Sequence, residues 1–144
     1  MSERLPSAPT LYILADDLIW ATRLAGQGRT LGAHVSTLQG LAGLRSLVAG
    51  GSIGATDLIA IDTTTRGIEP IAAVREAAAV GRVLALVQHD DPALRAAALG
   101  AGALRAAPYR ALFERGHAIL AELLGLPLPA VGSLEAPSPS GGAV

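Results

Sequence analysis

Short apolar runs alternate along the chain with segments whose apolar residues recur every three or four positions. The short runs predict strands over 11–15, 33–38, 56–62, 82–87 and 103–107. The segments that follow them predict helices over 18–31, 40–51, 70–81, 92–100 and 109–125. Because the strands are almost continuously apolar, we expect a parallel sheet that is covered on both faces. Right-handed crossovers then predict an α/β fold, a doubly wound three-layer sandwich with five strands in the order 2-1-3-4-5.

The ends of the predicted helices carry residues that favour starts and stops. Asp91 followed by Pro92 suits the first positions of a helix. Gly50-Gly51 and Gly125 suit helix C-termini. The first helix has a predicted apolar face made by Leu18, Ile19, Ala21, Leu24, Ala25 and Leu31.

The composition indicates one domain with a large core. The chain has 144 residues, and 51% of them are hydrophobic while only 16% are charged. We predict a single domain over 10–125. The residues that follow, 126–144, are rich in Pro, Gly and Ser and predict a flexible tail.

Charge and residue types exclude several classes of function. The net charge is −1, so nothing indicates a basic surface for nucleic acid. All eleven basic residues are Arg, and the absence of Cys removes disulfides and thiolate chemistry. The N-terminal residues lack an apolar signal segment, and no apolar run approaches the roughly 18 residues of a membrane span. We therefore expect no membrane association and, by default, a cytoplasmic protein.

Three carboxylates come at the ends of two strands that the predicted order makes neighbours. Asp16 and Asp17 follow the first strand, and Asp62 ends the third. In open parallel sheets, ligands bind beyond the carboxyl ends of the strands at the point where the strand order reverses. Three clustered carboxylates need a cation, and Mg²⁺ prefers oxygen ligands. The sequence therefore predicts a magnesium site made by Asp16, Asp17 and Asp62.

Structural roles remain open for the same residues. Asp16 and Asp17 also suit the N-cap and first turn of a helix. Asp62 also suits a strand-end carboxylate that accepts hydrogen bonds from loop amides. The hydroxyls of Thr63, Thr64 and Thr65 are expected to bond the backbone of their own loop.

Two further patterns have weaker functional interpretations. His89-Asp90-Asp91 could suggest a metal site, but the two Asp residues are expected to cap the helix that begins at Pro92. The glycines at 26–32 resemble a nucleotide-binding loop in spacing only, because they end a helix rather than join a strand to one. Trp20 is expected to pack on or near the apolar face of the first helix, and the alternative is that it contacts a partner protein.

The arrangement of these motifs resembles the receiver domain of bacterial response regulators. The resemblance covers roughly residues 10–124 and depends on the Asp16-Asp17 pair and on Asp62, 45 residues after Asp17. The stretch QHDDPALRAAALGAGA (88–103) and the pair Pro108-Tyr109 also match the family pattern. The resemblance implies a flavodoxin-like fold. It also implies that Asp16 and Asp17 hold Mg²⁺ while Asp62 accepts a phosphoryl group from a histidine kinase.

The chain departs from the family pattern at two polar positions of the switch. The family has a Lys before the Pro that follows strand five, and this chain has Ala107 there and no Lys elsewhere. The family has Ser or Thr at the end of strand four, where this chain has Val87. Arg105 lies on the same side of the strand as Ala107 and is a candidate substitute, although a guanidinium is not an ammonium.

We therefore predict a degenerate receiver, a pseudo-receiver, that is not an enzyme and acts through protein–protein contacts without phosphorylation. Asp16, Asp17 and Asp62 then remain as at most a weak Mg²⁺ site. The alternative is a single-domain response regulator that a histidine kinase phosphorylates on Asp62 with Mg²⁺. No output domain is patterned after residue 124, so the module is expected to stand alone. Its expected contact surface, for a kinase, a downstream protein or a second copy, is the helix 4–strand 5–helix 5 face with its four Arg residues: Arg95, Arg105, Arg110 and Arg115.

A small-molecule module of flavodoxin type is the third hypothesis. It requires a phosphate-binding loop after the first strand, where backbone amides face the anion. The chain has ADDLIW (15–20) at this place, and its carboxylates would repel a phosphate.

Overall fold

A computed structural model describes residues 8–129, and it contains five strands that are each followed by a helix. The strands are β1 (Thr10–Leu14), β2 (His34–Thr37), β3 (Leu58–Asp62), β4 (Arg82–Val87) and β5 (Arg105–Pro108). The helices are α1 (Leu18–Thr30), α2 (Gly40–Gly50), α3 (Pro70–Ala78), α4 (Pro92–Gly100) and α5 (Tyr109–Leu124). All neighbouring strands pair in parallel, in the order β2-β1-β3-β4-β5. The predicted fold class and strand order are confirmed.

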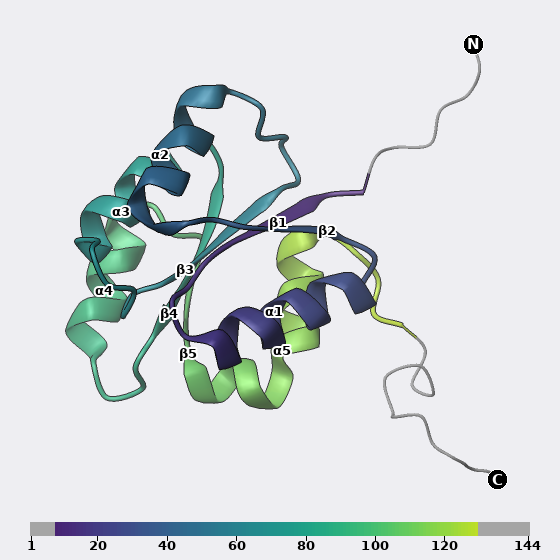
Figure 1. Cartoon of the computed structure of the whole chain (residues 1–144). Helices are drawn as coiled ribbons and strands as arrows, with labels where there is room; N and C mark the ends of the chain where they lie inside the picture. The colour runs from purple at the N-terminus through teal and green to yellow at the C-terminus, as the bar shows by residue number, and fades with distance from the viewer. Residues whose placement is uncertain (1–7, 130–144) are drawn as a thin grey trace, which may run out of the picture.

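The sheet lies between two layers of helices (Figure 1). Helices α1 and α5 pack against one face, and α2, α3 and α4 cover the other. Each face has its own apolar cluster, one that includes Leu24, Leu84 and Leu120 and one that includes Leu44, Ile59 and Val83. Every residue of β3 is buried, as expected for a central strand covered on both sides. Within residues 8–129, no helix combines the length and the apolar character that crossing a membrane requires.

Three element boundaries differ from the predicted ones by two residues or more, and one of them is the start of β3, at Leu58 and not at residue 56. Helix α3 ends at Ala78, not Gly81, because the N–H groups of Val80 and Gly81 both bond the Ala77 carbonyl in a turn. Strand β5 begins at Arg105, because the Ala103 N–H bonds back to Ala98 and closes α4. Most of the predicted tail, 130–144, lies outside the described residues, so its predicted flexibility stays a prediction.

The predicted apolar face of α1 is wrong at its first turn. Leu18 and Ile19 are 78% and 74% exposed, whereas Leu24 is fully buried. The buried face of α1 is instead made by Leu24, Gln27 and Gly28. Leu18 and Ile19 precede Leu24 by six and five positions, and at 3.6 residues per turn that places them away from this face.

Gly28 shows why glycine occurs near the end of α1. A Cβ at this position would lie 2.9 Å from the Leu11 Cδ2 atom and 3.2 Å from the Val35 Cγ2 atom. The missing side chain lets α1 approach β1 and β2 closely. Gly28 therefore serves helix–sheet packing, which agrees with the rejection of a nucleotide loop.

Candidate functional site

The three sequence-predicted carboxylates lie at the same edge of the sheet. Strands β1 and β3 pair in parallel with Leu14 opposite Ile61, so that the residues after Leu14 and at the end of β3 are neighbours. Asp62 is buried, with 1% of its surface exposed, while Asp16 and Asp17 are exposed. The acidic residues therefore lie at the predicted edge of the sheet. Asp62 is buried there, and Asp16 and Asp17 are at the surface.

Asp62 accepts hydrogen bonds from three donors on one oxygen. Its Oδ1 atom accepts from the Thr64 backbone N–H at 3.0 Å and from the Thr64 hydroxyl at 2.8 Å. The Tyr109 hydroxyl donates to the same atom. The Thr64 and Tyr109 hydroxyls are themselves 3.3 Å apart. These contacts hold the carboxylate against the β3–α3 loop and the start of α5.

Tyr109 is placed for this contact by the junction between β5 and α5. It directly follows Pro108 and is the first residue of α5, so its side chain reaches back over the sheet edge. Its ring packs on Trp20 from α1, with centroids 5.3 Å apart and planes tilted by 39°. Aromatic rings at this distance attract each other, so the contact with Trp20 favours the observed orientation of the Tyr109 ring. The phenol is therefore held in position by α1 as well as by Asp62.

The pKa of the Tyr109 phenol is raised well above its ordinary value of 10.0. Burial is the main cause, because it disfavours the phenolate. The hydrogen bond to Asp62 and the negative charges of Asp62 and Asp17 act in the same direction, while the Thr64 contact opposes them. Tyr109 is thus a protonated donor to Asp62 at neutral pH.

We expect Tyr109 to resist ionisation in the folded chain. The folded-state pKa is raised, so its contribution to stability is fully present below the unfolded value near 10 and is lost as the pH rises above it. Tyrosinate absorbance in a Tyr12→Phe background, where Tyr109 is the only tyrosine, measures this titration. Asp62→Asn should shift the titration to lower pH. An unchanged titration in Asp62→Asn would contradict the hydrogen bond.

Asp16 and Asp17 each have a structural role of their own. Asp17 is the N-cap of α1, and its Oδ1 atom accepts from the N–H groups of Ile19 at 2.8 Å and Trp20 at 3.4 Å. Asp16 accepts from the Arg66 backbone N–H at 2.8 Å, and the Arg66 Nε atom lies 4.0 Å away. Among residues 8–129, no three acidic, His or Cys side chains are arranged to hold a metal. As placed here, Asp16, Asp17 and Asp62 do not converge as three ligands of one ion, and the predicted magnesium site stays a prediction.

The threonines after Asp62 anchor their loop to the ends of neighbouring strands. Thr65 donates its hydroxyl to the Asp62 carbonyl at 2.7 Å, within the loop as expected. Thr63 instead donates to the Leu86 carbonyl of β4, at 2.7 Å. Both side chains are buried and have partners, so they are structural rather than chemically available.

The positions where the family has polar switch residues are apolar and buried. Ala107 is 3% exposed and Val87 is 1% exposed. Arg105, the candidate substitute, pairs with Glu122 of α5 at 2.9 Å. Within the described part of the chain, no Arg or His comes within ion-pair distance of Asp62. The resemblance to receiver domains implies a Lys ammonium beside Asp62, and in this chain the neutral phenol of Tyr109 contacts Asp62 instead.

The remaining candidates have the structural roles that the sequence favoured. Asp91 caps α4, accepting from the Leu94 N–H at 3.0 Å, and His89 is an exposed loop residue. Trp20 is partly buried against the cluster under α1 and α5.

Two polar residues of the structure were missed by sequence reasoning. Tyr109 was identified only as part of a Pro-aromatic pair, and no pattern in the chain indicates that its hydroxyl meets Asp62. Asp57 accepts from the Thr10 N–H at 2.8 Å and from the Gly54 N–H at 2.7 Å, which fixes the start of β1. The available signal was a charged residue near the start of the predicted strand 56–62, and the observed β3 begins only after it, at Leu58.

Comparison with known proteins finds similar structures. No protein-family model and no curated protein sequence matches the chain. A response regulator from Thermotoga maritima has a TM-score of 0.69 at 16% identity, covering 83% of this chain and 99% of its own. A response regulator receiver domain protein from Clostridium thermocellum has a TM-score of 0.68 at 16% identity, over 81% and 94% of the two chains. Full-length FixJ from B. japonicum has a TM-score of 0.69 at 18% identity, over 83% of this chain and 59% of that one. The chain therefore has the flavodoxin-like fold of response regulator receiver domains.

Proposed function

We propose that the chain is a receiver-fold signalling module that acts through protein–protein contacts and does not depend on phosphorylation of Asp62. The observation that carries the proposal is the set of contacts on Asp62. The Tyr109 and Thr64 hydroxyls both donate to its Oδ1 atom, and no cation accompanies it in the described residues. A carboxylate in these surroundings is a hydrogen-bond acceptor in a structural network.

The chemistry of phosphoryl transfer explains why these surroundings oppose a switch. A carboxylate that accepts several hydrogen bonds is a weaker nucleophile, and cations or hydrogen-bond donors must also stabilise the charge on the transferred phosphoryl group. Ala107 and Val87 present only methyl groups at the two places where the receiver resemblance implies an ammonium and a hydroxyl. Each missing preorganised contact costs about 2.7–4 kcal/mol of transition-state stabilisation, or roughly 10²–10³ in rate.

The contact surface that we propose for a partner is the α4–β5–α5 face. Of its four Arg residues, Arg105 pairs with Glu122 and Arg110 pairs with Glu114 at 3.5 Å. Arg95 and Arg115 are exposed and form no ion pair within residues 8–129. Arg is favoured at protein interfaces, so this face suits a histidine kinase, a downstream signalling protein or a second copy of the chain.

The alternative function is a working single-domain response regulator with Asp62 as its phosphoacceptor. The observation in its favour is the shared sheet edge, where Asp16, Asp17 and Asp62 follow paired strands. This alternative requires that Asp62 exchange the Tyr109 contact for a phosphodonor and a metal ion.

Incubation with Mg²⁺ and acetyl phosphate tests the proposal. We expect intact-mass spectrometry to show an unmodified chain under conditions in which a receiver domain with its Lys and Thr, run in parallel, becomes phosphorylated. A phosphoryl adduct that disappears in Asp62→Asn would contradict the proposal and support the alternative.

A further inference from the structure

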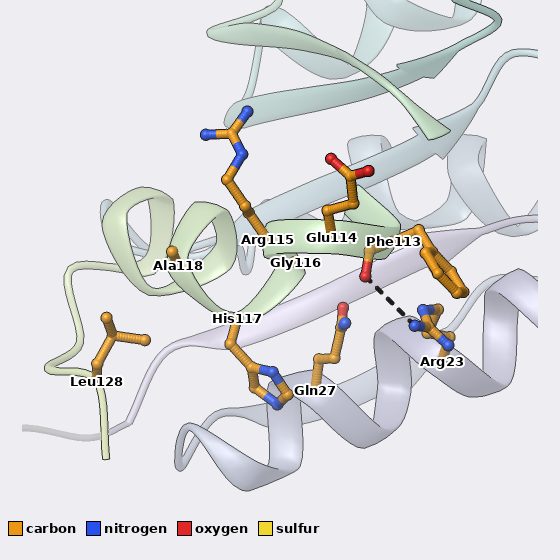
Figure 2. Close-up of a pocket in the computed structure, with 9 residues that line it drawn as sticks. All are labelled: Arg23, Gln27, Phe113, Glu114, Arg115, Gly116, His117, Ala118 and Leu128. Atoms are coloured by element: carbon orange, nitrogen blue, oxygen red, sulfur yellow. Dashed lines mark hydrogen bonds between the residues drawn. The ribbon is translucent and has the colours of Figure 1, made fainter. Parts of the chain in front are cut away.

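A trough lies between α1 and α5, on the side of the sheet that both helices cover. Figure 2 shows a hollow of about 350 Å³ there, with Leu128 at one end, His117 in the middle, and Arg23 with Phe113 at the other end. A second hollow of about 340 Å³ follows α1 and shares Arg23 and His117 with the first. The trough therefore runs from the residues after α5 toward the N-terminal ends of both helices.

The end of the trough at the start of the two helices is apolar and exposed. Phe113 is 62% exposed, and Leu18 and Ile19 are more exposed still. A third hollow, which Leu18 and Ile19 line, adjoins the trough at Arg23. Three large apolar side chains thus lie around Arg23 at the surface. Exposed apolar side chains that gather in this way mark an interaction site.

The last described residues already enter the trough at its other end. Leu126 packs on the apolar cluster beneath α1 and α5, and its N–H bonds the Ala121 carbonyl at 2.9 Å. Leu128 lines the trough, and Pro129 is partly buried. The chain therefore stays against the domain after α5 ends, and the next residues of the sequence follow from this end of the trough.

Those next residues carry apolar side chains at a spacing that fits the trough. Val131 and Leu134 follow Leu128 at intervals of three, and prolines occur at 127, 129, 137 and 139. Proline favours the polyproline II conformation, in which three residues make one turn and every third side chain is on the same face. In that conformation Leu134 would lie about 19 Å beyond Leu128. Because α5 rises about 18 Å between Phe113 and Gly125, the two lengths match.

Charge favours the same placement. Glu135 is the only residue in 123–144 with a charged side chain. Arg23 forms no ion pair within residues 8–129, and its guanidinium lies 4.3 Å from the centroid of the Phe113 ring. A segment that reaches Phe113 with Leu134 thus brings the Glu135 carboxylate next to the Arg23 guanidinium, where the opposite charges attract.

We propose that residues 129–136 of this chain bind along the trough, with Val131 beside His117, Leu134 on Phe113, and Glu135 paired with Arg23. Because Leu128 already lines the trough, the attached segment acts at a high effective concentration and needs only weak contacts. The inference restricts the predicted flexible tail to residues 137–144, and it does not rest on the proposed signalling function. The bound segment covers Phe113, so another protein reaches this surface only after the segment is released.

NMR of the full chain tests the inference at a single side chain. Phe113 is the only phenylalanine, so its ring protons are identified without ambiguity. We expect nuclear Overhauser contacts between these protons and the Leu134 methyl groups. The ¹H–¹⁵N heteronuclear Overhauser values of residues 130–136 should approach those of α5 and fall only after residue 136. Uniformly low values over 130–144, without contacts to Phe113, would overturn the inference.

Variants in the segment identify the contacts that hold it, and these positions lie after the last helix, so the domain itself is unchanged. Val131→Ser and Leu134→Ser should each lower the ratio of bound to free segment about tenfold. The double variant should shift the amide signals of residues 18–23 and 113–117. Val144→Ser, the same change of residue type beyond the segment, should leave those signals in place. Identical signals there in the natural chain and the double variant would refute the binding.

A sample that mixes isotope-labelled and unlabelled chains identifies the occupant of the trough. We expect the contact between Phe113 and Leu134 within one chain and none between labelled and unlabelled copies, at every protein concentration. Contacts that appear between copies and grow with concentration would show that the segment of a second chain fills the trough, which would overturn the assignment to the chain's own segment.

Discussion

Restoring the two missing polar side chains and removing the Tyr109 hydroxyl should convert the chain into a phosphate acceptor. We expect the triple variant Val87→Thr, Ala107→Lys, Tyr109→Phe to react with acetyl phosphate and Mg²⁺ at least about 100-fold faster than the natural chain. The introduced ammonium and hydroxyl would supply the donors that resemblance to receiver domains implies. Loss of the phenol would remove one of the three hydrogen-bond donors to the Asp62 Oδ1 atom.

The rate of Asp62 phosphorylation, measured by intact mass over time, checks this expectation. Tyr109→Phe alone is the matched control, and it should gain little because Ala107 and Val87 remain. Adding Asp62→Asn to the triple variant should abolish the reaction. Because Ala107 is buried, thermal unfolding must show that the triple variant is folded. A folded triple variant that reacts no faster than the natural chain would mean that these three side chains do not limit phosphorylation.

The largest expected loss of stability comes from the centre of the sheet. Leu84 in β4 is fully buried in the cluster beneath α1 and α5. Leu84→Ala removes buried methyl groups and leaves a cavity, which costs about 2–5 kcal/mol of the free energy of unfolding. Urea unfolding measures this loss. The matched control is Leu104→Ala, because Leu104 is 51% exposed and should change stability by only about 0.5 kcal/mol. Equal losses at the two positions would contradict the packing of β4.

The fold could be predicted from the sequence because the apolar pattern that indicates the strands does not depend on where each strand begins or ends. Five apolar runs separated by helical segments indicate a parallel sheet whatever their exact ends. The predicted boundaries are wrong where a single hydrogen bond determines where a helix ends or a strand begins. Ala103 bonds back to Ala98 instead of continuing β5, and Val80 and Gly81 turn back to Ala77 after α3. Leu18 and Ile19 are apolar but lie off the buried face of α1, because hydrophobic character alone does not fix a helical face at its first turn.

The candidate site was predictable in its location and not in its contacts. Strand-end positions placed Asp16, Asp17 and Asp62 at one edge, because topology determines which strand ends are neighbours. The contact between Tyr109 and Asp62 joins residues 47 positions apart. It depends on the direction of one side chain at the start of α5, and the spacing of residues carries no information about that direction. The same limit explains why Arg105 was considered as a substitute for Lys, whereas it pairs with Glu122.

The Tyr109 contact connects the acidic edge to α1 by direct packing. Asp62 accepts from Tyr109, Tyr109 packs on Trp20, and the Arg23 guanidinium lies near both the Trp20 and Phe113 rings. In receiver-like signalling without phosphorylation, such a connection would let a ligand or partner at α1 and α5 influence the edge of the sheet. Energetic coupling of this kind is reciprocal, so a change at Asp62 should also be detected at Trp20.

Backbone amide NMR of the full chain with Mg²⁺ and beryllofluoride, a mimic of the phosphoryl group, tests the central claim most directly. The claim is that Asp62 belongs to a structural network and does not receive a phosphoryl group. We predict that the amide signals of Asp16, Asp17 and Asp62 stay unchanged when both reagents are present. Shifts at these residues that need both reagents, and that disappear in Asp62→Asn, would contradict the claim and show a pocket that still recognises a phosphoryl group.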